Sequence, residues 1–134
     1  MKTEKFPSIS VVIPTLNCRL ALEKCLKSIS IQNYPKDKIE VIIADGGSKD
    51  STINTAKKYK AMVINNPLKT GEAGKAIGVK AAKGDLIALI DSDNILPNNH
   101  WLSDMVTPFK DQEIITSIFD FATQTPFFTA KHCT

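Results

Sequence analysis

Four short runs of aliphatic and β-branched residues recur along the chain, and polar or turn-forming residues follow each of them. The strong runs are Ile9–Pro14, Ile39–Asp45 and Leu86–Asp91, and a weaker run covers Ala61–Ile64. Runs that are apolar on both faces are typical of strands in a parallel sheet that helices cover on each side. We therefore expect four buried strands.

Between these runs the apolar positions change to a helical period. The first stripe, at spacing i, i+3, i+4 and i+7, consists of Leu22, Cys25, Leu26 and Ile29. The other expected helices are Ser51–Tyr59, a Gly/Ala-rich segment with Ala73, Ile77 and Ala81 on one face, and Trp101–Phe109. The alternation of strands and helices predicts an α/β fold: an open, mostly parallel, twisted sheet with helices on both faces.

The pattern weakens after Asp111. Residues 114–121 could form one more strand, whereas residues 122–134 show no clear period. A chain of 134 residues has room for one hydrophobic core. We expect residues 1–113 to form one structural part, and residues 114–134 to be the start of an incomplete second part or an irregular tail.

Composition and charge exclude several classes of function. With 43% hydrophobic and 23% charged residues, the chain is typical of a globular domain. The net charge of +3, with no basic run longer than Lys57-Lys58, offers no electrostatic footprint for nucleic acid. Residues 1–7 lack the apolar core of a signal peptide, and Cys18, Cys25 and Cys133 form an odd, widely spaced set typical of reduced thiols. We expect a cytoplasmic protein in which Cys25 is a core residue.

Polar residues follow three of the expected strands. They are Pro14-Thr15-Leu16-Asn17, Asp45-Gly46-Gly47-Ser48 and Asp91-Ser92-Asp93-Asn94. The carboxyl ends of parallel strands meet at one edge of the sheet, where open α/β folds bind their ligands. The sequence therefore predicts a polar site at this edge.

Asp91-Ser92-Asp93 places two carboxylates at that edge, where they would repel each other. A divalent cation such as Mg²⁺ would remove the repulsion, because it takes one or two carboxylates as ligands and completes its coordination with water and substrate phosphates. The alternative is a plain turn in which Asp93 or Asn94 caps the following segment. We favour the metal site because of its position at the end of a buried strand.

Asp45 precedes a tight Gly46-Gly47 turn. Its carboxylate could accept a hydrogen bond from a ring N–H of a pyrimidine base, or it could serve the turn alone. Lys75 lies near the start of the Gly/Ala-rich helix, where a cation would complement a diphosphate, or it is a solvated surface lysine. The segment is not a Walker motif, because Lys69 and Ala76 replace the required Gly and Ser or Thr.

Three motifs resemble those of the family 2 glycosyltransferases, which have the Rossmann-like GT-A fold. Val11–Asn17 matches the opening V-V-I-P-T-x-N, Asp45–Thr52 matches D-[DG]-G-S-x-D-x-T, and Gly84–Asp93 matches G-[DE]-x-x-x-x-x-D-x-D. The motifs occur in the family's order and at its usual separations. The resemblance covers about residues 9–109, which is nearly all of the interpretable chain.

The resemblance implies that residues 1–113 bind a UDP- or GDP-linked sugar donor and that Mg²⁺ or Mn²⁺ is the cofactor. Thr15 and Asp45 would touch the nucleoside, Asp93 would be the main metal ligand on the diphosphate, and Asp91 would support the metal or the ribose. The other implied donor-binding residues are Pro14, Asn17, Lys75 and Ser92. The reaction would be an inverting transfer to a hydroxyl of a glycan or lipid-carrier acceptor, in a longer form at the cytoplasmic face of a membrane.

The catalytic carboxylate that the family needs downstream is not recognisable. After Asp104 the acidic residues are Asp111, Glu113 and Asp120; none lies in a base motif, and Asp120 is the one we retain as a weak candidate. A non-catalytic donor-binding module is therefore an open alternative. Apolar surface around Phe119, Phe121, Phe127 and Phe128 would then favour self-association.

A third alternative is a phosphatase of the haloacid-dehalogenase type, whose nucleophile lies at the D-x-D end of an apolar strand. That motif normally ends the first strand and has Thr or Val two positions on, whereas this chain has it on the fourth expected strand, followed by Ile95. The sequence therefore favours the interpretation as a glycosyltransferase.

Overall fold

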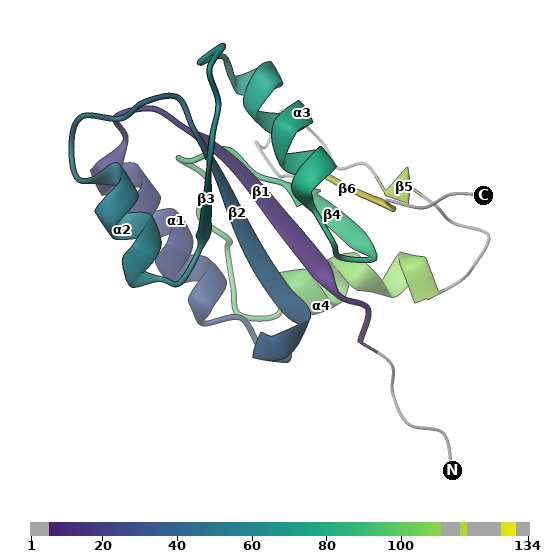
Figure 1. Ribbon diagram of the computed structural model, residues 1–134. Coiled ribbons are helices and arrows are strands. Elements are labelled where there is room, and N and C mark those ends of the chain that lie inside the picture. Colours follow the sequence, from purple (N-terminus) through teal and green to yellow (C-terminus); the bar gives the residue numbers. More distant parts are fainter. Residues whose placement is uncertain (1–5, 111–115, 118–126, 131–134) are drawn as a thin grey trace.

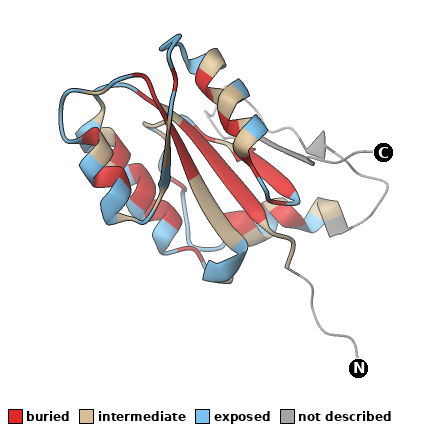
Figure 2. Ribbon diagram, in the orientation of Figure 1, coloured by how far each residue is buried: buried red, intermediate tan, exposed pale blue. Residues whose placement is uncertain are grey.

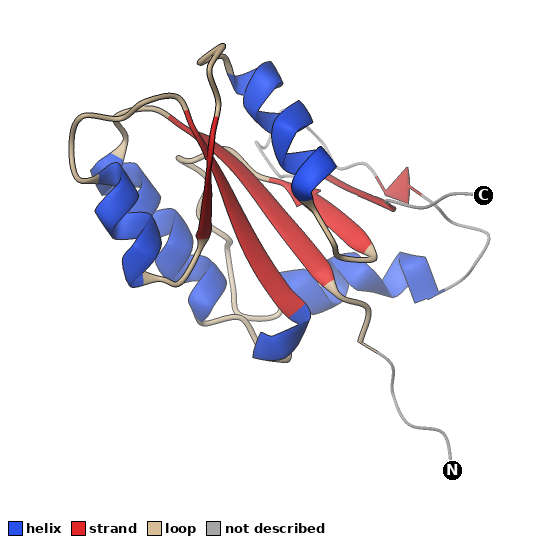
Figure 3. Cartoon of the chain, viewed as in Figure 1, coloured by secondary structure: helices blue, strands red, loops and turns tan. Residues whose placement is uncertain are grey.

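A computed structural model describes residues 6–110, 116–117 and 127–130 of the chain. Within these residues one sheet contains six strands in the order β3-β2-β1-β4-β6-β5 (Figures 1 and 3). The parallel strands are β1 (Ile9–Thr15), β2 (Ile39–Asp45), β3 (Met62–Asn65) and β4 (Leu86–Leu89). Two antiparallel strands, β5 (Thr116–Ser117) and β6 (Phe127–Ala130), extend the sheet beyond β4. The open, mostly parallel sheet expected from the sequence is confirmed.

Helices cover both faces of this sheet, as expected (Figure 1). The helices are α1 (Arg19–Ser30), α2 (Thr52–Lys58), α3 (Gly71–Ala81) and α4 (Trp101–Val106), with 3-10 turns at Lys36–Lys38 and Thr107–Lys110. Side chains of α1, α2 and α4 pack in one apolar cluster with one face of the sheet, and α3 packs with the other face. No helix in the described part of the chain is long and apolar enough to cross a membrane.

The central strand β1 determines where the strand ends meet. Its apolar residues are fully buried (Figure 2), because β2 and β4 pair with it on either side and helices cover both faces. The register with β2 runs from Ile9 opposite Ile39 to Thr15 opposite Asp45. This register brings the polar residues that follow the two strands together at one edge of the sheet.

Several strands in the structure have boundaries that differ from those expected from the sequence. The strand expected over 86–91 ends at Leu89, and within the expected strand over 114–121 the described part is Thr116–Ser117. Phe127–Ala130 lies in a stretch without a clear period, yet it forms β6. Its pairing partner β4 lies about forty residues earlier in sequence, with Leu86 opposite Ala130, so long-range pairing rather than local pattern defines this strand. The division of the chain at residue 113 stays a prediction.

Helix α3 uses a different face from the one we expected. Ala73, Ile77 and Ala81 are only half-buried, whereas Gly74 and Gly78 are buried against the sheet. A Cβ atom at Gly74 would lie 2.8 Å from the Pro14 Cβ, and one at Gly78 would overlap the Val12 side chain. The spacing of four residues places both glycines on one face, so the helix backbone itself contacts β1.

Gly78→Ala should therefore destabilise the protein by about 1–3 kcal/mol, because the added methyl group overpacks the contact with β1. Gly71→Ala is the matched control, since a Cβ at Gly71 meets nothing within 4 Å. Urea unfolding followed by circular dichroism measures both free energies of unfolding. Equal stabilities of the two variants would contradict the tight approach of α3 to β1.

Candidate functional site

A hollow of about 220 Å³ lies at the carboxyl edge of the parallel strands. Residues at the end of β1 and in the segments after β1, β3 and β4 line it, and four of them belong to the site expected from the sequence: Pro14, Thr15, Asp91 and Ser92. The expected convergence of these strand ends on one edge therefore occurs in the structure. Leu16 and Lys69 complete the rim, together with Thr70 and Gly71 at the start of α3.

The buried carboxylate of Asp45 lies at the centre of the first loop pair. Oδ1 accepts hydrogen bonds from Thr15 Oγ1 at 2.7 Å and Ser48 Oγ at 2.6 Å, and Oδ2 accepts from the backbone N–H groups of Gly47 at 3.0 Å and Ser48 at 2.7 Å. Gly47 has φ of 99°, a backbone conformation that favours glycine. Asp45 therefore organises the turn after β2 and links it to the end of β1.

These contacts also set the charge state of Asp45. Burial opposes its ionisation, but the hydrogen bonds from Ser48, Thr15 and Gly47 outweigh burial and lower the pKa of the carboxyl below its usual value of 3.8. The group is thus a carboxylate at neutral pH. A carboxylate accepts about four hydrogen bonds, and four protein donors already use this capacity. A contact from Asp45 to a nucleobase stays a prediction.

A second set of hydrogen bonds joins the loop after β1 to the loop after β2. Asn17, at φ of 49°, accepts at Oδ1 from the Lys49 N–H at 2.7 Å, and its own N–H donates to Ser48 Oγ at 2.8 Å. Asp50 accepts from both the hydroxyl and the N–H of Thr52, and the hydroxyl bond chiefly lowers the pKa of Asp50. In the described structure Asn17 therefore serves the loop geometry; its expected contact with the donor stays a prediction.

The D-x-D segment follows β4 and is exposed. The Asp91 N–H donates to Asn94 Oδ1 at 2.9 Å, and the Asn94 N–H donates to the Asp91 carbonyl at 3.0 Å. Asn94 therefore holds this turn, and it is one of the two residues, Asp93 and Asn94, that we considered for a turn role. The Asp93 carboxylate has no hydrogen-bond or ion-pair partner among the residues that the structure describes.

Lys75 of α3 lies beside this segment. Its Nζ is 3.2 Å from Asp91 Oδ1, and the two side chains are 36% and 60% exposed. Lys75 therefore lies at the D-x-D motif, and its expected contact with a diphosphate stays a prediction. Within residues 6–110, no three His, Cys, Asp or Glu side chains gather into a ready-made metal site. The carboxylates that the chain offers at this edge are the two of the D-x-D motif.

Asn66 is a site residue that the sequence analysis did not select. It is buried beside the hollow, and its Nδ2 donates to the Thr70 carbonyl at 2.9 Å. Its Oδ1 has no hydrogen-bond partner within the described structure. The sequence did contain a signal for Asn66, because this residue follows the weak strand over 61–64. The signal was not specific, since amide side chains after strands are common in turns.

Other candidates fall outside this site or outside the described residues. Burial raises the pKa of the Cys25 thiol to about 12, so Cys25 is a core residue and not a nucleophile. Asp120, Phe119 and Phe121 lie outside the described residues, as do the side chains of Phe127 and Phe128.

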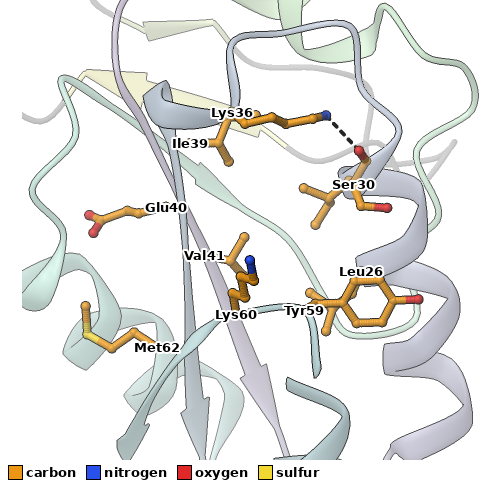
Figure 4. A pocket seen from close by; sticks show the side chains of 10 residues that line it. Leu26, Ser30, Lys36, Ile39, Glu40, Val41, Tyr59, Lys60 and Met62 are labelled. Carbon is orange, nitrogen blue, oxygen red and sulfur yellow. Dashed lines mark hydrogen bonds between the residues drawn. The ribbon is translucent and has the colours of Figure 1, made fainter. Parts of the chain in front are cut away.

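A larger hollow, of about 520 Å³, lies beside the first residues of β2, at the opposite end of the strand from Asp45. Leu26, Tyr59 and Met62 border it, and the Lys36 ammonium donates to the Ser30 carbonyl at 2.7 Å (Figure 4). None of the site residues expected from the sequence lines it. We therefore assign the candidate chemistry to the smaller hollow.

The chain is similar to several curated glycosyltransferases. Among curated sequences, the chain is 31% identical to the glycosyltransferase AglE of Haloferax volcanii over 106 residues, which cover 75% of this chain and 34% of that protein. It is 31% identical to the poly(ribitol-phosphate) β-N-acetylglucosaminyltransferase TarS of Staphylococcus aureus over 101 residues, covering 71% of this chain and 18% of TarS. The chain thus spans about a third or less of these relatives.

Solved structures show the same fold. The crystal structure of S. aureus TarS residues 1–349 in complex with UDP matches with a TM-score of 0.72 and 25% identity, over 81% of this chain and 34% of that one. The mannosyltransferase PcManGT of Pyrobaculum calidifontis, in complex with GDP-Man and Mn²⁺, matches with a TM-score of 0.74 and 24% identity, over 82% of this chain and 34% of that one. These likenesses confirm the GT-A fold.

The profile of the family described as "Glycosyl transferase family 2" matches residues 10–132, which is nearly the whole chain. The three motifs, the sheet order and the polar edge agree with this match. The chain belongs to glycosyl transferase family 2.

Proposed function

We propose that this chain binds the nucleoside diphosphate of a sugar donor in the hollow at the carboxyl edge, and that the protein transfers the sugar to an acceptor hydroxyl with inversion. The observation that carries the proposal is the meeting of Thr15, Lys75, Asp91 and Ser92 at one edge, beside the Asp93 carboxylate, which has no partner among the described residues. The likeness to TarS, whose fragment was solved with UDP and with UDP-GlcNAc, supports a nucleotide in this place.

The donor set at the edge fits a hard divalent cation such as Mg²⁺ or Mn²⁺. Two carboxylates separated by one residue supply oxygen ligands, and water and the diphosphate would complete the coordination. Asp93 is the better ligand, because its carboxylate is exposed and unpaired among the described residues, whereas Asp91 already pairs with Lys75. When bound, the cation would neutralise charge that develops on the departing diphosphate.

The chain's own residues would share the remaining tasks. Lys75 is close enough to Asp91 to compensate charge on the same phosphates, and its flexible stem allows it to move from the carboxylate to a ligand. Thr15 and the Asp45 turn would form a rigid wall for the nucleoside. Asn66 Oδ1 adds a buried acceptor that has no partner among the described residues, and it would suit a donor group on a base.

Asp93→Asn tests the metal assignment. Loss of the charged ligand should weaken UDP binding in the presence of Mn²⁺ by about tenfold or more, which is 1.4 kcal/mol or more, down to the affinity that the unaltered chain shows with EDTA. Titration calorimetry measures both affinities. Asp37→Asn, at an exposed aspartate of the 3-10 turn before β2, is the control.

Two results would decide against this assignment. Equal affinities of Asp93→Asn and the unaltered chain with Mn²⁺ would remove Asp93 as a ligand. UDP binding by the unaltered chain that is the same with Mn²⁺ and with EDTA would remove the metal dependence altogether. Binding of neither UDP nor GDP would remove the proposed function itself.

Asp45→Asn separates the organising role of this residue from a contact with the base. In this variant an amide NH₂ replaces one carboxylate oxygen, so donors of Ser48, Gly47 or Thr15 lose their acceptor. We therefore expect the folding stability to fall by about 1–3 kcal/mol. We also expect weaker binding of UDP. A variant that loses UDP affinity at unchanged stability would instead indicate a direct contact with the base.

The pH dependence gives an independent check of Asp45. Its pKa is lowered in the folded protein, so its contribution to stability is fully present above the unfolded value of about 3.8 and is lost as the pH falls through the folded value. The stability difference between the unaltered chain and Asp45→Asn should therefore shrink as the pH falls below 3.8. Urea unfolding from pH 7 down to about pH 3 measures it, and a difference that stays constant would contradict the role of the ionised carboxylate.

A further inference from the structure

The segment that carries Asp91 and Asp93 contains no helix or strand between β4 and α4, although all of it lies within the described residues. Such a segment keeps a defined path only where other parts of the protein hold its backbone. Three side chains contact this backbone: Cys25 and Ser28 of α1, and Gln32, which lies two residues after the end of α1 at Ser30. Their spacing of three and four residues continues one face of the helix past its end, where Gln32 Nε2 also donates to the Ser28 carbonyl at 3.2 Å.

Ser28 and Gln32 make the decisive contacts. Ser28 Oγ accepts from the Leu96 N–H at 3.0 Å and donates to the Cys25 carbonyl at 2.7 Å. Gln32 Oε1 accepts from the Leu102 N–H at 2.9 Å, and Nε2 donates to the Asn98 carbonyl at 2.5 Å. The two side chains thus hold the backbone at three points after the D-x-D motif.

These hydrogen bonds are buried, which makes them costly to break. Ser28 is 6% exposed and Gln32 is 2% exposed, so water cannot replace a lost partner without opening the protein. Cys25, which is also buried, lies with its Sγ 3.9 Å from the Asp91 carbonyl and packs against the start of the segment. The path of the segment relative to α1 is therefore set by buried polar contacts.

The same helix is tied to the other site loop at its first residues. The Cys18 N–H donates to Thr52 Oγ1 at 2.9 Å, and the Arg19 N–H donates to Asp50 Oδ2 at 3.3 Å. A rigid helix thus connects the Asp45 turn, on the nucleoside side, with the D-x-D segment, on the diphosphate side. Its length between these contacts sets the separation of the two loops.

We infer that Ser28 and Gln32 are positioning residues for the metal and the diphosphate, because they hold the D-x-D segment at a set distance from the nucleoside wall. The inference rests on the proposed function, since it assumes that Asp93 binds a cation together with the nucleoside diphosphate. It assigns a functional reason to two buried polar side chains, one on the core side of α1 and one just after its end, where apolar residues would pack without needing partners.

The test uses Ser28→Ala in the 134-residue chain. Its readout is the ratio of UDP affinities measured by calorimetry with Mn²⁺ and with EDTA. This ratio reports the metal-dependent part of binding and does not depend on the fraction of folded protein. We expect the ratio to fall about tenfold, the lower end of the effect known for residues that orient metal ligands, while the affinity in EDTA stays within about twofold.

Ser30→Ala is the matched control, because Ser30 lies on the exposed side of the same helix and its hydroxyl bonds only within the helix, to the Lys27 carbonyl. Its ratio should equal that of the unaltered chain. Gln32→Met is the second variant: it keeps a similar volume, removes the contacts to Asn98 and Leu102, and should lower the ratio as Ser28→Ala does. If Ser28→Ala does not fold, the ratio measured for Gln32→Met tests the inference in its place.

The outcomes separate this inference from the proposed function. If the unaltered chain shows no metal-dependent UDP binding, the proposed function fails and the inference fails with it. If the unaltered chain shows it and the folded Ser28 and Gln32 variants keep the same ratio, the inference alone is overturned. Lower thermal stability with an unchanged ratio would likewise identify the two residues as structural only.

Discussion

The geometry of the site depends on the hydrogen bonds that the ionised carboxylate of Asp45 accepts. The register of β1 and β2 places Asp45 opposite Thr15, and the buried carboxylate binds Thr15 together with the Gly47–Ser48 turn. Because the group is buried and fully used by protein donors, it cannot move without leaving several polar groups unpaired. The end of β1 and the loop after β2 therefore behave as one rigid unit.

The rest of the site is built outward from this unit by helices on both faces of the sheet. Helix α1 begins on hydrogen bonds to Thr52 and Asp50, and its buried Ser28, together with Gln32 just after the helix, holds the D-x-D segment. Helix α3 approaches β1 through Gly74 and Gly78 and brings Lys75 to Asp91 from the other face. The Lys75 ammonium of α3 and the Asp91 carboxylate after β4 thus meet at the edge, although separate elements supply their positions.

Several motif residues serve the loops themselves rather than pointing at the hollow. Asn17 and Ser48 join the loop after β1 to the loop after β2, and Asp50 and Thr52 hold the start of α2. Motif residues of this kind preorganise a site, because loops that are already ordered lose little conformational entropy when a ligand binds. Among the described residues, the side chains of Lys75, Asp91 and Asp93 and the Oδ1 of Asn66 take no part in these loop contacts.

The sequence by itself determined the four parallel strands, the helices between them and the edge where the polar residues gather. Short apolar runs and their spacing are local signals, and parallel strands necessarily bring their carboxyl ends together. Only the tertiary structure decided that Gly74 and Gly78 face the sheet, that β6 pairs with β4, and that Ser28 and Gln32 hold the D-x-D segment. Those contacts join residues that lie far apart in the chain. The sequence does not record which side chain will bind a given backbone N–H or C=O group.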